Sequence, residues 1–335
     1  MSYSRVQFIN MKIETRDEAA WHIVTQDPSR MRAAREADEF ERQIQKIQEM
    51  LLNLIAVPFE QEESVLKIVL FPEFMLQPDR GAYGVEALPL FFQRMSLFLS
   101  SKPQFIHFMF FFGSMPIAYL LPAPSELCHV ENVVPILFCS CFGIESKIVY
   151  KKFRSLVDYY DVDEDQSSIF YGNLGRRHLL DVPRSLVNIT KAEDLISEIQ
   201  APRDFENLEG VGIFTFANAV KRNGQKMIFA LEVCLDHDMG RLRFSVLNPP
   251  EESPVDIHIV LSCGLADISP LYVVAKKDGY VIHLDGYEPC STLYQVAFQK
   301  GSIVLNQLKR KLFISYELTT GEEFCVVVSH ELQID

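Results

Sequence analysis

An acid, an amine and a thiol each lie at the end of an apolar run with the composition of a buried strand. Glu73 lies at the end of KIVLFPEF, Lys152 near the end of KIVYKKF, and Cys234 directly after MIFALEV. Sheets of α/β proteins commonly place ligands at the ends of their strands. Taken singly, these residues have ordinary structural explanations: a turn or helix cap, a solvated lysine and a small buried thiol. Taken together, they offer a base, a cation that stabilises an oxyanion, and a nucleophile.

The elements that must position these residues alternate in the first half of the chain and meander in the second. Apolar residues three and four apart between Ser29 and Ala56 predict an amphipathic helix. The continuous apolar run over 65–74 predicts a strand that is buried on both faces. A helix over 84–99 is expected next, followed by strands over 104–112, 133–143, 145–153, 226–237, 255–264 and 272–287. This order predicts a layered α/β or α+β domain rather than two independent halves.

The strings FPEF, YKKFRSL and MIFALEVCLDH resemble the three signatures of the carbon–nitrogen hydrolase family, the nitrilase superfamily, in its chain order Glu, Lys, Cys. The resemblance covers roughly residues 15–290. It implies a four-layer α-β-β-α sandwich that forms one domain over residues 1–335. The interval from the lysine to the cysteine is longer than is usual for the family, which indicates an insertion at about 158–210.

The resemblance implies hydrolysis of a non-peptide C–N bond, in an amide, an N-carbamoyl compound or a nitrile, through a cysteine thioester and without a cofactor. In the family's scheme Cys234 attacks the substrate carbon, Glu73 acts as general base, and Lys152 stabilises the oxyanion. Lys152 is preferred to Lys151 because the family's lysine matches the second lysine of YKK. Alternation along a strand then places the two lysines on opposite faces.

Two further residues are candidates for the same site. The backbone N–H of Leu235 is expected to help hold the oxyanion, since the residue after a nucleophile often does so. Leu235 also departs from the aromatic residue that often follows the cysteine in the family. Glu164, in DVDEDQ, is the nearest candidate for a second carboxylate of the family, and a solvated acidic loop is an equal explanation of this stretch.

Composition and motifs exclude several other classes of protein. Acidic residues outnumber basic ones by 45 to 32, and the net charge of −13 disfavours nucleic acid as a partner. The apolar stretch over 102–126 is broken by prolines and rich in phenylalanine, which favours a buried strand over a membrane span. The sequence contains no CxxC pair, which would indicate a metal site. The string EGVGIF has two glycines but not the third glycine of a dinucleotide-binding loop.

The seven cysteines have no regular spacing, which predicts reduced thiols and a cytoplasmic protein. The first residues, MSYSRVQFINMKIETRDEAAW, have no continuous apolar core followed by a small-residue cleavage site, so no secretory signal is expected. The resemblance also implies a homodimer or higher homo-oligomer. A catalytically idle scaffold that binds a small molecule or a protein is the alternative function. The presence of Glu, Lys and Cys together argues against that alternative, whereas Leu235 and the insertion argue for it.

Overall fold

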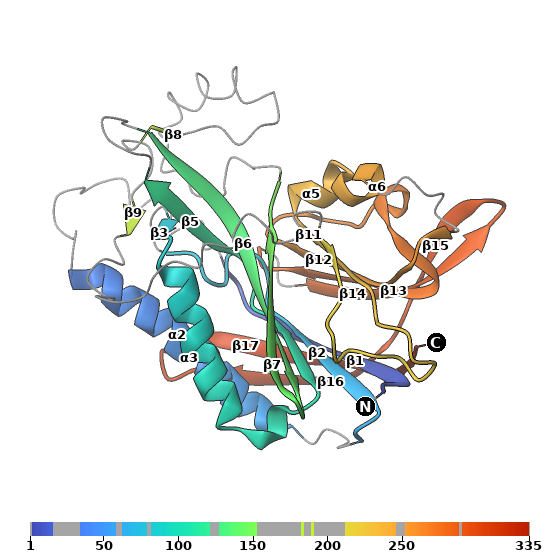
Figure 1. The fold of residues 1–335 in the computed structure, drawn as a ribbon, viewed down its shortest axis with the longest axis horizontal. Coiled ribbons are helices and arrows are strands. Elements are labelled where there is room, and N and C mark those ends of the chain that lie inside the picture. The colour runs from blue at the N-terminus through green and yellow to red at the C-terminus, as the bar shows by residue number, and fades with distance from the viewer. Residues whose placement is uncertain are drawn as a thin grey trace.

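Two β-sheets share one apolar core at the centre of the molecule (Figure 1). This computed structural model describes residues 2–15, 34–57, 62–78, 82–120, 127–152, 182–183, 189–190, 212–245, 252–287 and 290–334. The larger sheet has the order β16 (Arg310–Glu317), β17 (Glu323–Ser329), β1 (Arg5–Lys12), β2 (Val65–Leu70), β4 (Phe108–Phe111), β6 (Leu127–Ser140), β5 (Met115–Leu120), β3 (Ala82–Gly84) and β9 (Ile189–Thr190). Off this path, β18 (Leu332–Gln333) pairs with β1, and β7 (Gly143–Tyr150) and β8 (Val182–Pro183) pair with β6.

The smaller sheet carries the strand that precedes Cys234. Its order is β10 (Ile213–Phe214), β11 (Phe229–Val233), β12 (Val255–Ser262), β13 (Ala275–Asp285), β14 (Cys290–Gln299) and β15 (Ser302–Gln307). Strands β11, β12 and β13 are parallel, as are β1, β2 and β4 of the larger sheet. Because parallel strands end at the same edge of a sheet, the residues that follow β11, β12 and β13 lie along one edge.

Helices cover the outer face of each sheet. On the larger sheet lie α2 (Ala34–Ile55), α3 (Ala87–Ser100) and the 3₁₀ turn η1 (Pro103–Phe105), and on the smaller sheet lie α5 (Leu235–Asp238), α6 (Arg241–Ser245) and the turn η6 (Pro270–Tyr272) (Figure 1). Leu242 of α6 packs on Ala230 of β11, whose neighbour Leu231 faces the other sheet. The layers are therefore helix, sheet, sheet and helix, which confirms the predicted α-β-β-α sandwich.

The first strands are apolar throughout because both of their faces are buried. In β2, Leu66 and Ile68 point into the core between the sheets, while Val69 points under α2 and α3. In β4, Phe108 and Phe110 lie under the helices, and their rings stack with centroids 5.9 Å apart. The apolar stretch over 102–126 thus contains buried strands. None of the helices in the described ranges is long and apolar enough to cross a membrane.

The predicted elements occur with shifted ends. The helix predicted from Ser29 is described over Ala34–Ile55, and its predicted apolar face is buried; this face consists of Phe40, Ile44, Ile47, Met50, Leu51 and Leu54. The strand predicted over 226–237 ends at Val233 because the chain turns sharply at the next residue. The proposed insertion at 158–210 lies outside the described residues, apart from the short strands β8 and β9.

Candidate active site

Lys151, not Lys152, forms the ion pair with Glu73. The Nζ atom of Lys151 lies 2.8 Å from Oε1 of Glu73, and the two side chains are 1% and 0% exposed. Lys152 is exposed. Alternation does separate the two lysines, but Lys151 follows the direction of Val149, which packs between the sheets, and not that of Tyr150. The structure therefore places Lys151, and not the predicted Lys152, beside Glu73.

The carboxylate of Glu73 is held by a tight loop after β2. Phe74 has a positive φ of 64°, and its N–H donates to Oγ of Ser114 over 3.0 Å. Gly113 also has a positive φ, of 75°, and a Cβ at this position would lie 2.1 Å from the carbonyl oxygen of Pro72. The loop that carries Glu73 therefore packs directly against the loop that follows β4. The ring of Phe74 lies beside Lys151, with its centroid 5.8 Å from Nζ.

Cys234 lies in a strained turn between β11 and α5. Its φ of 47° and ψ of −107° form a combination that residues with a Cβ rarely adopt. Its N–H donates to the carbonyl oxygen of Leu261 over 2.8 Å, and its side chain is partly exposed. A thiol on a sharp turn from strand to helix has the geometry expected of a nucleophile, because the turn carries the side chain out of the sheet.

Asp236 joins the cysteine turn to the lysine segment. Both of its carboxylate oxygens accept the backbone N–H of Lys152, each over 3.0 Å. Arg241 donates to Asp236 Oδ2 over 2.7 Å and also donates to the carbonyl oxygen of Tyr150. Asp236 is two residues after Cys234, and Lys152 directly follows Lys151. These bonds therefore bring the ends of β2, β7 and β11 together.

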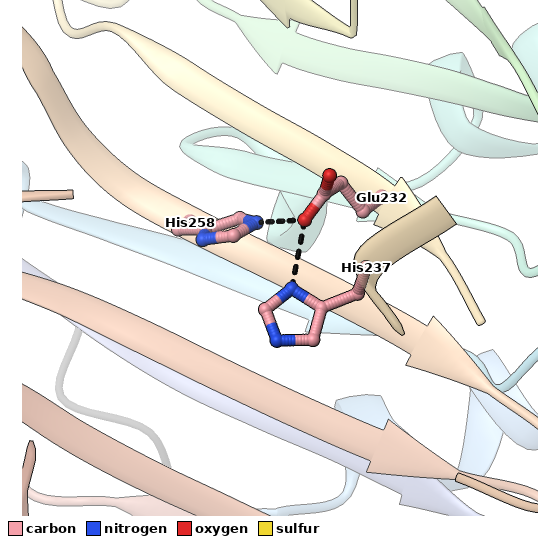
Figure 2. A group of neighbouring side chains, drawn as sticks. All are labelled: Glu232, His237 and His258. Atoms are coloured by element: carbon pink, nitrogen blue, oxygen red, sulfur yellow. Dashed lines mark hydrogen bonds and ion pairs between the residues drawn. The ribbon is translucent and has the colours of Figure 1, made fainter. Parts of the chain in front are cut away.

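A buried carboxylate, that of Glu232, contacts two imidazoles close in sequence and in pairing to the cysteine turn. Figure 2 shows these three side chains. Oε2 of Glu232 is 2.8 Å from Nδ1 of His237 and 3.0 Å from Nε2 of His258, and none of the three side chains is exposed. Oε1 of Glu232 accepts the N–H of Leu242 over 2.8 Å. Burial acts to raise the pKa of Glu232, but the hydrogen bonds from the two imidazoles outweigh burial and lower this pKa to about 2. Glu232 is therefore ionised.

The donor set of Glu232, His237 and His258 also has the composition of a metal site, since its ligand atoms lie within 4.8 Å of one another. The separations of 2.8 and 3.0 Å from Glu232 Oε2 are those of hydrogen bonds. Nδ1 of His258 accepts the N–H of Val274 over 3.4 Å, so its Nε2 carries the proton that faces Glu232. The arrangement is therefore better explained by hydrogen bonds from the two imidazoles to Glu232 than by ligation of a metal ion.

Ser262, His283 and Asp285 form a second buried polar cluster at the same edge of the smaller sheet. Oγ of Ser262 is 2.7 Å from Nε2 of His283 and donates to Oδ2 of Asp285 over 2.6 Å. The same carboxylate oxygen accepts the N–H groups of Gly264 and Leu265. The hydroxyl proton is committed to the carboxylate rather than to the imidazole, so this is not the proton path of a serine nucleophile. The cluster fixes the loop after β12.

Acid is expected to weaken the fold through His283. Burial lowers the pKa of His283 from 6.5 to about 4, so the unfolded chain takes up the proton first and stability is lost as the pH falls from 6.5 towards 4. Between pH about 7 and about 5 this group removes about 2 kcal/mol from the free energy of unfolding. Urea denaturation at both pH values should show a loss in the parent protein that is smaller by about that amount in His283→Gln. Equal losses in the two proteins would contradict this assignment.

The remaining predicted residues are placed only in part. Leu235 is the first residue of α5, where a backbone N–H has no acceptor within its own helix. Glu164 lies outside the described residues. Sequence reasoning missed Asp236, Glu232 and His258, although Asp236 belongs to the charged string LDHDMGR that follows the cysteine.

The comparisons with known proteins yield a single kind of match. No family model matches the sequence, and no curated protein matches it. The structure is similar to the crystal structure of Saccharomyces cerevisiae Nit3, a member of branch 10 of the nitrilase superfamily. The match has 12% sequence identity and a TM-score of 0.43, and it covers 98% of this chain and 90% of that chain.

Proposed function

We propose that this protein hydrolyses a non-peptide C–N bond, with Cys234 as nucleophile, Glu73 as general base and Lys151 as the cation that stabilises the oxyanion. The observation that carries the proposal is the buried Lys151–Glu73 pair, which Asp236 connects to the strained Cys234 turn. Lys151 replaces Lys152 in this role because the ammonium of Lys151 contacts Glu73.

The geometry suits an acyl transfer in two halves. A cysteine thiol has an ordinary pKa of about 8.5 and is mostly protonated at neutral pH, so it needs a base to attack. In the first half, for an amide or N-carbamoyl substrate, the thiol proton passes to Glu73, the sulfur bonds to the carbonyl carbon, and the negative charge on oxygen is stabilised by Lys151 and the N–H of Leu235. The C–N bond then breaks, and the leaving nitrogen takes the proton from Glu73.

The second half regenerates the thiol. A water molecule gives a proton to Glu73 and attacks the thioester carbon, and the oxyanion forms at the same place as before. The C–S bond breaks, the sulfur recovers the proton, and a carboxylic acid leaves. Glu73 and Lys151 thus serve both halves, as a proton carrier and as a fixed positive charge.

Burial of the ion pair supports a chemical role. Removing two charges from water is costly, and well-packed apolar residues of similar volume are often as stabilising as a buried ion pair. Lys151 and Glu73 both lie at the ends of strands of the larger sheet, and they are joined through the backbone to a strained cysteine at the end of a strand of the smaller sheet. A charged pair kept at such a place is expected to serve catalysis as well as packing.

The proposal also includes the domain organisation, the substrate class, the compartment and the oligomeric state. A single domain over residues 1–335 is supported by the core that the two sheets share. The substrate is a small amide, N-carbamoyl compound or nitrile, and the net charge of −13 disfavours a nucleic-acid partner. The reduced thiols suit the cytoplasm, and the resemblance to the nitrilase superfamily suggests a homo-oligomer.

Product release from a substrate panel tests the proposal. Ammonia or amine is measured after incubation with small aliphatic amides, N-carbamoyl compounds and nitriles, for the parent protein and for Cys234→Ala. Release by the parent and none by the variant is the expected result. Equal release by the two proteins would contradict a cysteine mechanism, and no release from any compound would favour the idle scaffold.

A further inference from the structure

The buried network of Glu232, His237 and His258 spans the turn that carries Cys234. Glu232 is two residues before the cysteine and His237 is three residues after it. Glu232 Oε2 and His237 Nδ1 lie 2.8 Å apart (Figure 2), so this bond joins the residues on either side of Cys234. The backbone N–H of His237 also donates to the carbonyl oxygen of Cys234 over 2.9 Å. Both the side chain and the backbone of His237 therefore restrain the turn.

A single carboxylate connects the elements around the turn. Glu232, at the end of β11, accepts the N–H of Leu242 in α6, the Nδ1–H of His237 in α5 and the Nε2–H of His258 in β12. All three side chains are fully buried, so water does not compete for these bonds. Hydrogen bonds to an ionised acceptor in a dry setting are stronger than those between neutral groups.

The strained backbone of Cys234 needs such support. A residue with a Cβ persists at φ 47° and ψ −107° only where the surrounding structure over-determines it. The side chain of His237 is bonded to the strand that precedes the turn, so relaxation of the turn would break this bond. The network and the strained conformation therefore stabilise each other through the same short segment.

We infer that Glu232, His237 and His258 are positioning residues that hold the Cys234 turn in its strained conformation and so direct the thiol towards Glu73 and Lys151. This inference rests on the proposed function in taking Cys234 as the nucleophile and Glu73 and Lys151 as its partners. None of the three residues needs to contact substrate. Their effect is transmitted through the backbone on either side of the cysteine.

Two substitutions of His237 separate its hydrogen bond from its bulk. His237→Asn keeps an N–H donor close to the place of Nδ1, whereas His237→Leu has no donor. Glu232→Gln is a third variant that keeps the size of the side chain and leaves one of the three donors without its acceptor. This variant tests the same network if His237→Leu does not fold, and circular dichroism checks the fold of each protein.

The readout is the alkylation of Cys234 by iodoacetamide, measured by peptide mass spectrometry over a range of pH. The exposed thiol of Cys141, on the turn between β6 and β7, is the reference within the same molecule. His237→Leu should lower the Cys234 rate relative to Cys141 about tenfold at neutral pH and should give Cys234 the pH profile of Cys141. His237→Asn should stay within about threefold of the parent, and Glu232→Gln should lie between the two.

Two results would overturn the inference. One is a Cys234 rate and pH profile in His237→Leu and Glu232→Gln equal to those of the parent. The other is one equivalent of zinc in the purified parent protein that is lost in His237→Leu, which would make the cluster a metal site. Because no substrate is used, a failure of the proposed hydrolysis would leave this comparison unchanged.

Discussion

Lys151→Met is expected to abolish amide turnover and to lower the free energy of unfolding by about 3–5 kcal/mol. Methionine preserves most of the volume of lysine but removes the ammonium 2.8 Å from Glu73. The carboxylate of Glu73 is then left in the core without its cation, and the oxyanion loses its stabilising charge. Turnover is measured on the best compound of the panel, and stability by urea denaturation.

Lys152→Met is the matched control for this prediction. The substitution is the same and the position is the next one along the chain, but this side chain is exposed. Its effect on the free energy of unfolding should stay within about 0.5 kcal/mol, and turnover should be retained. The double variant Lys151→Met/Glu73→Gln should recover part of the lost stability, because neither buried charge remains. If Lys152→Met caused the larger loss in both measurements, the sequence-based choice of Lys152 would be right and the present site wrong.

Replacing Cys234 is expected to separate chemistry from backbone strain. Cys234→Ala and Cys234→Gly both remove the thiol, and each should reduce turnover at least about 10³-fold. Cys234→Gly should nevertheless be the more stable of the two by about 1 kcal/mol, since glycine adopts a positive φ without the steric cost of a Cβ. Urea denaturation of the two variants measures this difference.

Cys263→Ala is the control for the loss of a thiol. Cys263 is buried and follows β12, the strand next to β11, but it has no part in the proposed chemistry. The variant should retain turnover. A Cys234→Gly protein less stable than Cys234→Ala would show that the turn is unstrained in solution and would remove the support for a positioned nucleophile.

Much of the fold could be predicted because burial leaves a direct mark on the sequence. The face of α2 is visible in the spacing of its apolar residues, and β2 in an unbroken run of them. Glu73 and Cys234 could be identified because they interrupt or end such runs. These signals come from residues whose neighbours along the chain share their environment.

The choice between Lys151 and Lys152 could not be made in this way. Alternation predicts that the two side chains point in opposite directions, but it does not say which of them faces the other sheet. The residues before them, Val149 and Tyr150, are both apolar, so the pattern is the same for either assignment. The family resemblance favoured the second lysine, and the packing of Val149 between the sheets places the first one at Glu73.

The network of Glu232, His237 and His258 around the cysteine turn could not be predicted from the sequence for a different reason. The string MIFALEVCL is one continuous apolar run apart from Glu232, and nothing in it marks the sharp turn after Val233. Once that turn exists, Glu232 and His237 face each other across it. His258 reaches them from β12, and such a contact depends on strand pairing rather than on local sequence.

Mapping of a trapped acyl group tests the central claim most directly. The reaction is quenched with acid during turnover of the best amide substrate, and the mass of each cysteine-containing peptide is measured by mass spectrometry. The account predicts an acyl group on Cys234, in the form of a thioester that hydroxylamine removes, and none on Cys141 or Cys263. Acyl groups spread equally over the cysteines would contradict the account. Turnover that leaves no acyl adduct and that persists in Cys234→Ala would also contradict it.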